Sequence, residues 1–134
     1  EISKKIKNRP EWIIGDFGCG ENLLQKELTN KVYAFDFVAI DDTVISCDLS
    51  SLPLDNSVLD VVVFSLSLMG TNYTDYLKEA YRVLKPYGVV LIAEPSTRWE
   101  DRDDELKSKL TDAGFKVSGE IKHSDRFIYV DGIK

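Results

Sequence analysis

Residues 12–22 are WIIGDFGCGEN. The run Trp12–Phe17 is short and apolar, which is typical of a buried strand. Gly18 and Gly20 follow it, and a helix is expected over 22–28. Two glycines between a strand and a helix allow a tight turn and let a ligand approach the backbone with no Cβ in the way. This stretch therefore predicts a strand, a ligand-binding loop and a helix, the first unit of an α/β fold.

Short apolar runs alternate with helical segments along the rest of the chain. Further strands are expected at 32–38, 44–47, 59–66, 89–93, 115–121 and 127–130, and helices at 73–84 and 103–113. Such alternation predicts a mostly parallel, twisted sheet with helices on both faces. The last two strands are too close for a helical crossover, so one strand near the C-terminus should be antiparallel. The sequence therefore predicts a single α/β domain over residues 1–134.

Composition limits the classes of protein to which the chain can belong. It has 134 residues, 43% of them hydrophobic, and a net charge of −6, which argues against nucleic-acid binding through a bulk positive field. No run reaches the ~20 apolar residues of a membrane span. Two cysteines and one histidine are too few for a disulfide framework or a zinc site. We therefore expect no metal and no membrane partner. Residues 1–9 are basic and are expected to be the end of a preceding segment that is missing here.

Three predicted strands end in carboxylates: Asp16, Asp36 and Asp48. Ligands of open α/β sheets bind beyond the carboxyl ends of the strands. Asp16 suits a ligand with an amino group, and Asp36 can accept both hydroxyls of a ribose. Asp48 can accept a hydrogen bond from an adenine amine while Leu49 packs on the ring. The third position of a G-x-G-x-x-G dinucleotide loop holds Leu23, so the set predicts S-adenosylmethionine rather than a dinucleotide.

The end of the fourth predicted strand should face the transferred methyl group. Ser65 lies there and is expected to contact the cofactor. The Asp/Asn-Pro-Pro-aromatic motif of enzymes that methylate amino groups of adenine or cytosine is not found at this place, and no His, Glu or Lys stands ready as a general base. A ring nitrogen has its own lone pair and needs no deprotonation, so methyl transfer to one can depend on positioning alone.

Six segments carry a resemblance to a known family. They are DFGCGEN at 16–22, FDFVAIDD at 35–42, CDLSSLPL at 47–54, FSLSLMGTN at 64–72, EAYRVLKPYG at 79–88 and IAEPSTRWED at 92–101. From about Arg9 to the C-terminus the chain resembles the methyltransferase domain of the ribosomal RNA-processing protein 8 family, and SLSLMGTN is far more specific than the glycine loop. The family's segment before this domain, which closes over the cofactor, has no counterpart here.

The resemblance implies a Rossmann-like class I methyltransferase fold with S-adenosylmethionine as the methyl donor. It implies N1-methylation of an adenosine in large-subunit ribosomal RNA, in the nucleolus of the nucleus, or in the cytoplasm if the source is not eukaryotic. Carried over by position, the cofactor residues are Gly18 and Gly20 in the loop, Asp36 for the ribose, Asp48 and Leu49 for the adenine, and Ser65 on the methionine side.

A substrate contact is expected after the fifth predicted strand. Arg98 is expected to contact RNA phosphate or the target base, with Trp99 as a stacking partner. The alternative is that Arg98 pairs with the neighbouring Glu100 and Asp101. Because the chain is acidic, RNA affinity would have to come from an upstream basic segment, assembly factors or a local patch.

Two other functions remain open from the sequence. One is a small-molecule methyltransferase that uses the same cofactor pocket. The other is a cofactor-binding scaffold or regulatory module in ribosome biogenesis or chromatin silencing, with chromatin partners. Labelled methyl transfer to precursor ribosomal RNA separates both from an RNA methyltransferase.

Overall fold

The computed structural model describes residues 6–18, 23–65, 67–68, 72–117 and 119–134. Its elements, in chain order, are β1 (Ile13–Phe17), α2 (Leu23–Glu27), β2 (Lys31–Asp36), β3 (Val44–Ser46), β4 (Leu59–Ser65), α3 (Tyr73–Val83), β5 (Leu84–Pro95), α4 (Asp103–Ala113), β6 (Lys116–Val117), β7 (Lys122–His123) and β8 (Phe127–Ile133). Helix α2 lies between β1 and β2, β2 to β4 follow one another directly, and α3 and α4 flank β5, which is the predicted order of elements.

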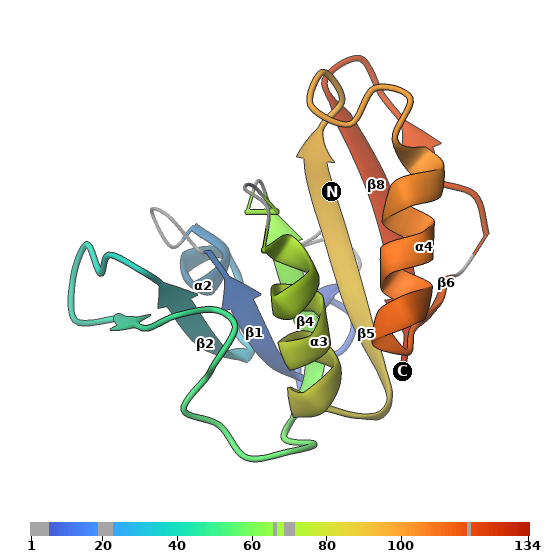
Figure 1. The fold of residues 1–134 in the computed structure, drawn as a ribbon. Coiled ribbons are helices and arrows are strands. Elements are labelled where there is room, and N and C mark those ends of the chain that lie inside the picture. The colour runs from blue at the N-terminus through green and yellow to red at the C-terminus, as the bar shows by residue number, and fades with distance from the viewer. Residues whose placement is uncertain (1–5, 19–22, 66, 69–71, 118) are drawn as a thin grey trace.

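The strands form one mixed sheet (Figure 1). Its order is β3-β2-β1-β4-β5-β8-β6, and β7 pairs with β8 outside this path. Strands β1 to β5 are parallel to their neighbours, whereas β8 is antiparallel to β5. Because β6 and β7 are antiparallel to β8, they run in the direction of the parallel set. The predicted fold, a mostly parallel sheet with one antiparallel strand near the C-terminus, is confirmed.

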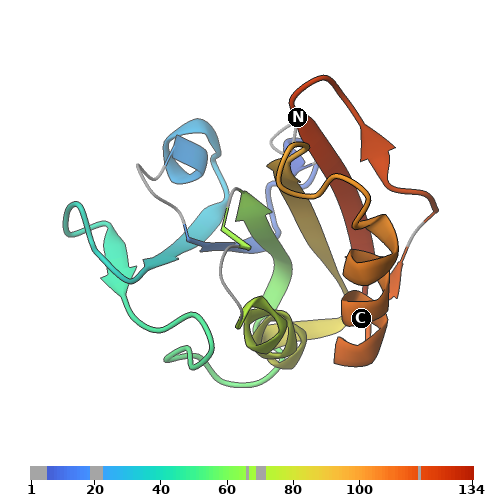
Figure 2. The ribbon, with the colours of Figure 1, turned by 45° about the horizontal axis from the view of Figure 1, so that its top comes forward.

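Helices cover both faces of the sheet (Figure 2). Helices α3 and α4 lie on one face, over a large core in which the Phe17 ring meets the edge of Phe64 at 5.2 Å between centroids. On the other face, a smaller cluster that includes Ile6, Leu28 and Val61 packs with Leu24 of α2. Strands buried on both faces read as continuous apolar runs, which is why β4 was visible in the sequence. Within the described residues, no helix is long and apolar enough to cross a membrane.

Strand β5 begins earlier than predicted, at Leu84 instead of Val89. Leu84 pairs with Leu59 of β4, and the register then shifts before regular pairing resumes at Val89. Tyr87 takes a left-handed φ of 68° within this irregular stretch. Pro86 and Gly88, which signal a helix end, therefore lie inside the irregular start of a strand.

Other boundaries also differ from the prediction. Of the described residues in the predicted strand 115–121, only Lys116 and Val117 form a strand, β6. Gly119 follows at a φ of 74°, and β7 lies just beyond the predicted range. The predicted strand 32–38 ends at Asp36, and Phe37 and Val38 are exposed. Apolar character extended both predictions past residues whose backbone leaves the sheet.

Candidate functional site

Four of the predicted cofactor residues, Gly18, Asp36, Asp48 and Leu49, lie where β1, β2 and β3 end. These strands are neighbours in the sheet, so their carboxyl ends lie at one edge. Backbone hydrogen bonds fix the chain just beyond them: the Gly18 N–H donates to the carbonyl of Phe35 at 2.8 Å, and the Cys47 N–H donates to that of Asp36 at 2.9 Å. The structure thus places Gly18, Asp36 and the start of the Asp48 loop along a single edge.

Both the backbone conformation at position 18 and the close packing around it require a glycine there. Its φ is 75°, in the left-handed region that glycine adopts without strain. A Cβ at this position would lie 2.5 Å from the Cβ of Ser67 and 3.7 Å from Cδ1 of Leu49. Gly18 and Leu49, which the sequence assigned to one pocket, are therefore close in space. Gly20 lies outside the described residues.

Asp16 is a buried acid at the end of β1, with 4% of its surface exposed. Burial, and secondarily the nearby charge of Asp36, raise its pKa to about 7. Both causes disfavour the ionised form of Asp16. A ligand that brings a positive charge to this carboxyl would restore its ionisation.

Asp48 is in the opposite situation. It is exposed, and its Oδ1 accepts hydrogen bonds from the N–H of Ser50 at 2.9 Å and from the Ser50 hydroxyl at 2.7 Å. These two bonds lower the pKa of Asp48. The turn that they close holds an ionised acceptor beside the buried Leu49.

Ser65 is the last residue of β4 and is exposed. It pairs in register with Ala93 of β5, one residue beyond the level at which Phe64 pairs with Phe17 of β1. Ser65 therefore lies at the same edge of the sheet as Gly18, as expected for a residue on the methionine side of a cofactor. This role stays a prediction.

The sequence interpretation missed two residues at this edge, Glu94 and Ser67. Glu94 is fully buried near the end of β5. Its carboxylate accepts hydrogen bonds from the N–H groups of Ser67 at 2.9 Å and Leu68 at 3.1 Å. The signal was an acidic residue in the otherwise apolar run LIAEP, where a charge is retained only if the fold provides donors.

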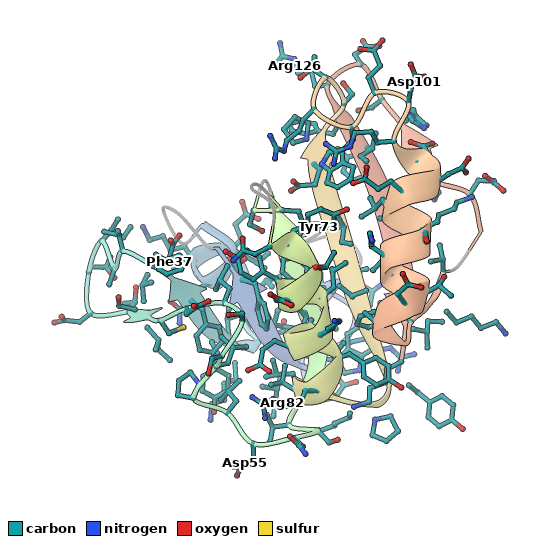
Figure 3. The ribbon with its side chains drawn as sticks, viewed as in Figure 1. Phe37, Asp55, Tyr73, Arg82, Asp101 and Arg126 are labelled. Carbon is teal, nitrogen blue, oxygen red and sulfur yellow. The ribbon has the colours of Figure 1, made fainter. Side chains whose placement is uncertain are left out.

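The expected stacking role of Trp99 is wrong. Its side chain is 1% exposed, and its ring packs edge-on against Tyr73 at 5.4 Å, with the Arg102 guanidinium 4.3 Å from its centroid. Trp99 is thus part of the core and offers no face to a base. Arg98 is exposed and forms no ion pair with Glu100 or Asp101, all of which are described. Figure 3 shows Asp101, in the same loop, at the same end of the molecule as Arg126.

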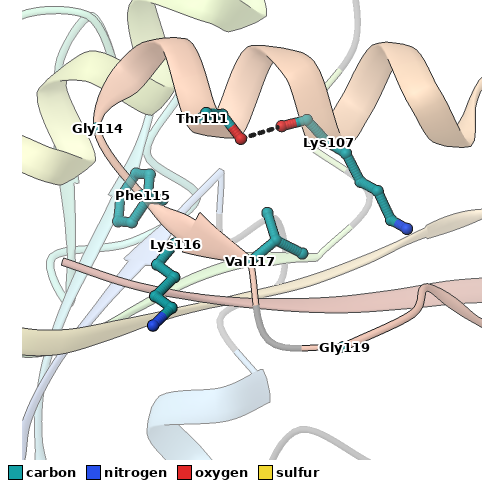
Figure 4. A pocket seen from close by; sticks show the side chains of 7 residues that line it. All are labelled: Lys107, Thr111, Gly114, Phe115, Lys116, Val117 and Gly119. Carbon is teal, nitrogen blue, oxygen red and sulfur yellow. Dashed lines mark hydrogen bonds between the residues drawn. The ribbon is translucent and has the colours of Figure 1, made fainter.

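A hollow of about 500 Å³ lies elsewhere, between α4 and β6 (Figure 4). Lys116 on its wall pairs with Ile133, which pairs with Val89, so the hollow lies at the opposite end of β5 from Glu94. Two of its polar side chains are already engaged: the Thr111 hydroxyl donates to the Lys107 carbonyl at 2.9 Å, and the Lys107 ammonium donates to Glu120 at 2.9 Å. Nor do the described residues bring together three or more His, Cys, Asp or Glu side chains that could hold a metal ion.

Comparison with known proteins gives the family. A family model described as "Hypothetical methyltransferase" matches residues 1–134. Ribosomal RNA-processing protein 8 of Arabidopsis thaliana is 48% identical over 99 residues, which are 74% of this chain and 34% of the relative. The 25S rRNA (adenine(645)-N(1))-methyltransferase of Schizosaccharomyces pombe is 39% identical over 116 residues, 83% of this chain and 36% of the relative. The chain thus spans about a third of the length of these relatives.

Among solved structures, a Burkholderia thailandensis 1,6-didemethyltoxoflavin-N1-methyltransferase with bound S-adenosylhomocysteine superposes with a TM-score of 0.77. The match covers all of this chain and 77% of the other at 16% identity, so it shows a shared fold alone. The fold and the family model agree with each other and with the six sequence segments. The chain therefore belongs to a methyltransferase family, that of the ribosomal RNA-processing protein 8 proteins.

Proposed function

We propose that this chain is an S-adenosylmethionine-dependent methyltransferase domain that methylates N1 of an adenosine in large-subunit ribosomal RNA. The observation that carries the proposal is the row of acidic side chains, Asp16, Asp36 and Asp48, at neighbouring strand ends beside a glycine that a Cβ would block. The name of the Schizosaccharomyces pombe relative supports the choice of base and ring atom. The whole of residues 1–134 is proposed to form this single domain.

The residues present fit such a cofactor. Asp16 would hold the ammonium group, because a cation beside this buried carboxyl would favour its ionised form. Asp36 would accept the ribose hydroxyls, and Asp48 and Leu49 would hold the adenine. Gly18 and Gly20 would let the backbone approach, and Ser65 would contact the methionine part. When bound, the cofactor supplies an electrophilic methyl group.

The chemistry that remains for the chain is positioning. N1 of adenine carries a lone pair and needs no general base before it attacks a methyl group. The protein must then hold the base at the end of β4 and exclude water. Because the net charge is −6, affinity for RNA is proposed to come from a basic segment that precedes the domain or from assembly factors. Arg98 is proposed to add a local contact to RNA phosphate. The place of action would be the nucleolus.

A calorimetric titration with S-adenosylhomocysteine, with NAD as the control ligand, tests the cofactor. We expect S-adenosylhomocysteine to bind and NAD not to bind. Asp36→Ala should abolish the binding of S-adenosylhomocysteine. Binding of neither ligand by the full-length protein would refute the cofactor site.

Transfer of a labelled methyl group to unmodified large-subunit ribosomal RNA tests the substrate. The label should appear as N1-methyladenosine after nuclease digestion. Cofactor binding without labelled RNA would favour the scaffold function instead, and label on small molecules alone would favour the small-molecule methyltransferase.

A further inference from the structure

Glu94 places a carboxylate in a fully buried position of β5, one strand away from the proposed cofactor strands. A buried carboxylate is costly unless several donors satisfy it. Here the donors are two successive backbone N–H groups, those of Ser67 and Leu68. Each oxygen accepts one of them, Oε2 from Ser67 at 2.9 Å and Oε1 from Leu68 at 3.1 Å. The carboxylate thus holds the main chain just after β4 through two hydrogen bonds, one to each oxygen, and we call this pair of bonds the clamp.

The clamped residues touch the glycine loop. A Cβ built on Gly18 would lie 2.5 Å from the Cβ of Ser67, so the Ser67 side chain lies directly against the Gly18 backbone. The Ser67 hydroxyl is buried and forms no hydrogen bond within the described chain. Glu94, Ser67 and Gly18 therefore form a continuous contact from β5 to the loop after β1.

We infer that Glu94 is a positioning residue for methyl transfer. It sets the position of the chain after β4, where the target base would lie, relative to the glycine loop, where the cofactor would lie. The inference rests on the proposed function, because only a transfer reaction needs these two segments in a fixed relation. Misplacement of reacting groups by about 1 Å can slow a reaction about 100-fold.

Glu94→Gln tests this role with almost no change in volume. An amide has one acceptor oxygen, so its NH2 group would face one of the two backbone donors. The clamp would then lose one of its two hydrogen bonds. Glu94→Asp keeps the charge and both acceptors on a side chain one methylene shorter. It should therefore retain part of the function that Glu94→Gln loses.

Glu79→Gln is the matched control. Glu79 is another buried glutamate that accepts from a backbone N–H, that of Leu52, and it also pairs with Arg82 at 2.7 Å. Its loss should destabilise the protein without changing the link between Ser67 and Gly18. A comparison of the two variants separates positioning from general loss of stability.

Three measurements on the full-length protein decide the matter: amide exchange of Ser67 and Leu68, affinity for S-adenosylhomocysteine, and the single-turnover rate on unmodified large-subunit ribosomal RNA. In Glu94→Gln, we expect faster exchange at both amides, nearly unchanged affinity, and a rate about 10- to 100-fold lower. In Glu79→Gln, all three should stay near the wild type after correction for the folded fraction.

The inference is overturned if Glu94→Gln leaves the exchange of both amides unchanged, or if it loosens them and the rate stays at the wild-type value. Equal losses of rate in both glutamine variants would also overturn it, because the effect would then be one of stability. A wild-type protein that neither binds S-adenosylhomocysteine nor methylates RNA refutes the proposed function, and the exchange measurement still decides whether Glu94 holds this segment.

Discussion

Replacing Asp16 with Asn should stabilise the ligand-free protein at neutral pH while it removes cofactor binding. Asp16 is buried, and its pKa of about 7 lies far above the ordinary value of 3.8. At a pH between 3.8 and about 7, Asp16 keeps its proton in the folded protein but has released it in the unfolded chain. Stability must therefore fall as pH rises through this range. Asparagine is neutral at every pH and avoids this loss.

The size of the effect follows from the two pKa values. They differ by about 3 pH units, and each unit corresponds to about 1.4 kcal/mol. Ionisation of Asp16 thus removes up to about 4 kcal/mol of folding free energy by pH 8. Since the buried amide also needs hydrogen bonds, we expect Asp16→Asn to gain about 2–4 kcal/mol there. Near pH 4 the gain vanishes and only the cost of the buried amide remains, so Asp16→Asn should be up to about 2 kcal/mol less stable than the wild type there.

Urea unfolding of both proteins at pH 5, 6, 7 and 8 measures this difference. The gain from Asp16→Asn should grow with pH and level off above about pH 7. Asp60→Asn is a control that should lose stability, because Asp60 accepts a hydrogen bond from the Ile13 N–H at 2.8 Å and lies 3.4 Å from the Lys85 ammonium. A pH-independent difference, or a loss of stability in Asp16→Asn at pH 8, would refute the reasoning.

Four further outcomes are expected. Affinity for S-adenosylhomocysteine should be about tenfold weaker at pH 6 than at pH 8, because Asp16 must release its proton to hold an ammonium group; calorimetry at equal ionic strength would show a flat profile if Asp16 is not involved. Gly18→Ala should lose cofactor binding and at least about 1 kcal/mol of stability, measured by urea unfolding, because its φ of 75° and the contact with Ser67 both disfavour a Cβ. Arg98→Ala should lower RNA methylation while cofactor affinity persists. Trp99→Ala should lower the free energy of unfolding by about 3–5 kcal/mol, as for other buried aromatic side chains. A stable Trp99→Ala protein that binds RNA weakly would instead support the stacking role.

The sequence predicted the fold well because buried parallel strands have a distinctive composition. The β4 run from Leu59 to Ser65 is apolar on both faces, and the glycines after Phe17 mark the turn that follows β1. Boundaries were less predictable, since they depend on partners distant in sequence. Nothing local indicates that Leu84 would pair with Leu59 and begin β5 before its proline.

The position of a candidate site residue was predictable where the residue lies at a strand end. Asp36 and Asp48 could be placed from sequence because the ends of parallel strands meet at one edge. Glu94 could not, since its role depends on two N–H groups 26 and 27 residues earlier in the chain. Trp99 was misplaced because an aromatic residue in a polar loop gives no local sign of the Tyr73 and Arg102 side chains that cover it.

Two buried carboxyl groups at one edge of the sheet, those of Glu94 and Asp16, have different surroundings. Glu94 receives backbone donors from its own chain, so its charge is satisfied before any ligand arrives. Asp16 has burial and a neighbouring acid as the causes of its raised pKa, so its ionised form is disfavoured until a cation comes. A carboxylate that accepts hydrogen bonds from its own chain helps to hold a fixed geometry. A carboxyl group whose ionised form is disfavoured by its surroundings contributes to binding, because a cationic ligand makes ionisation favourable. This difference is the physical basis on which we propose a positioning role for Glu94 and cofactor binding for Asp16. If it is correct, Asp16→Asn and Glu94→Gln should change stability in opposite directions at pH 8.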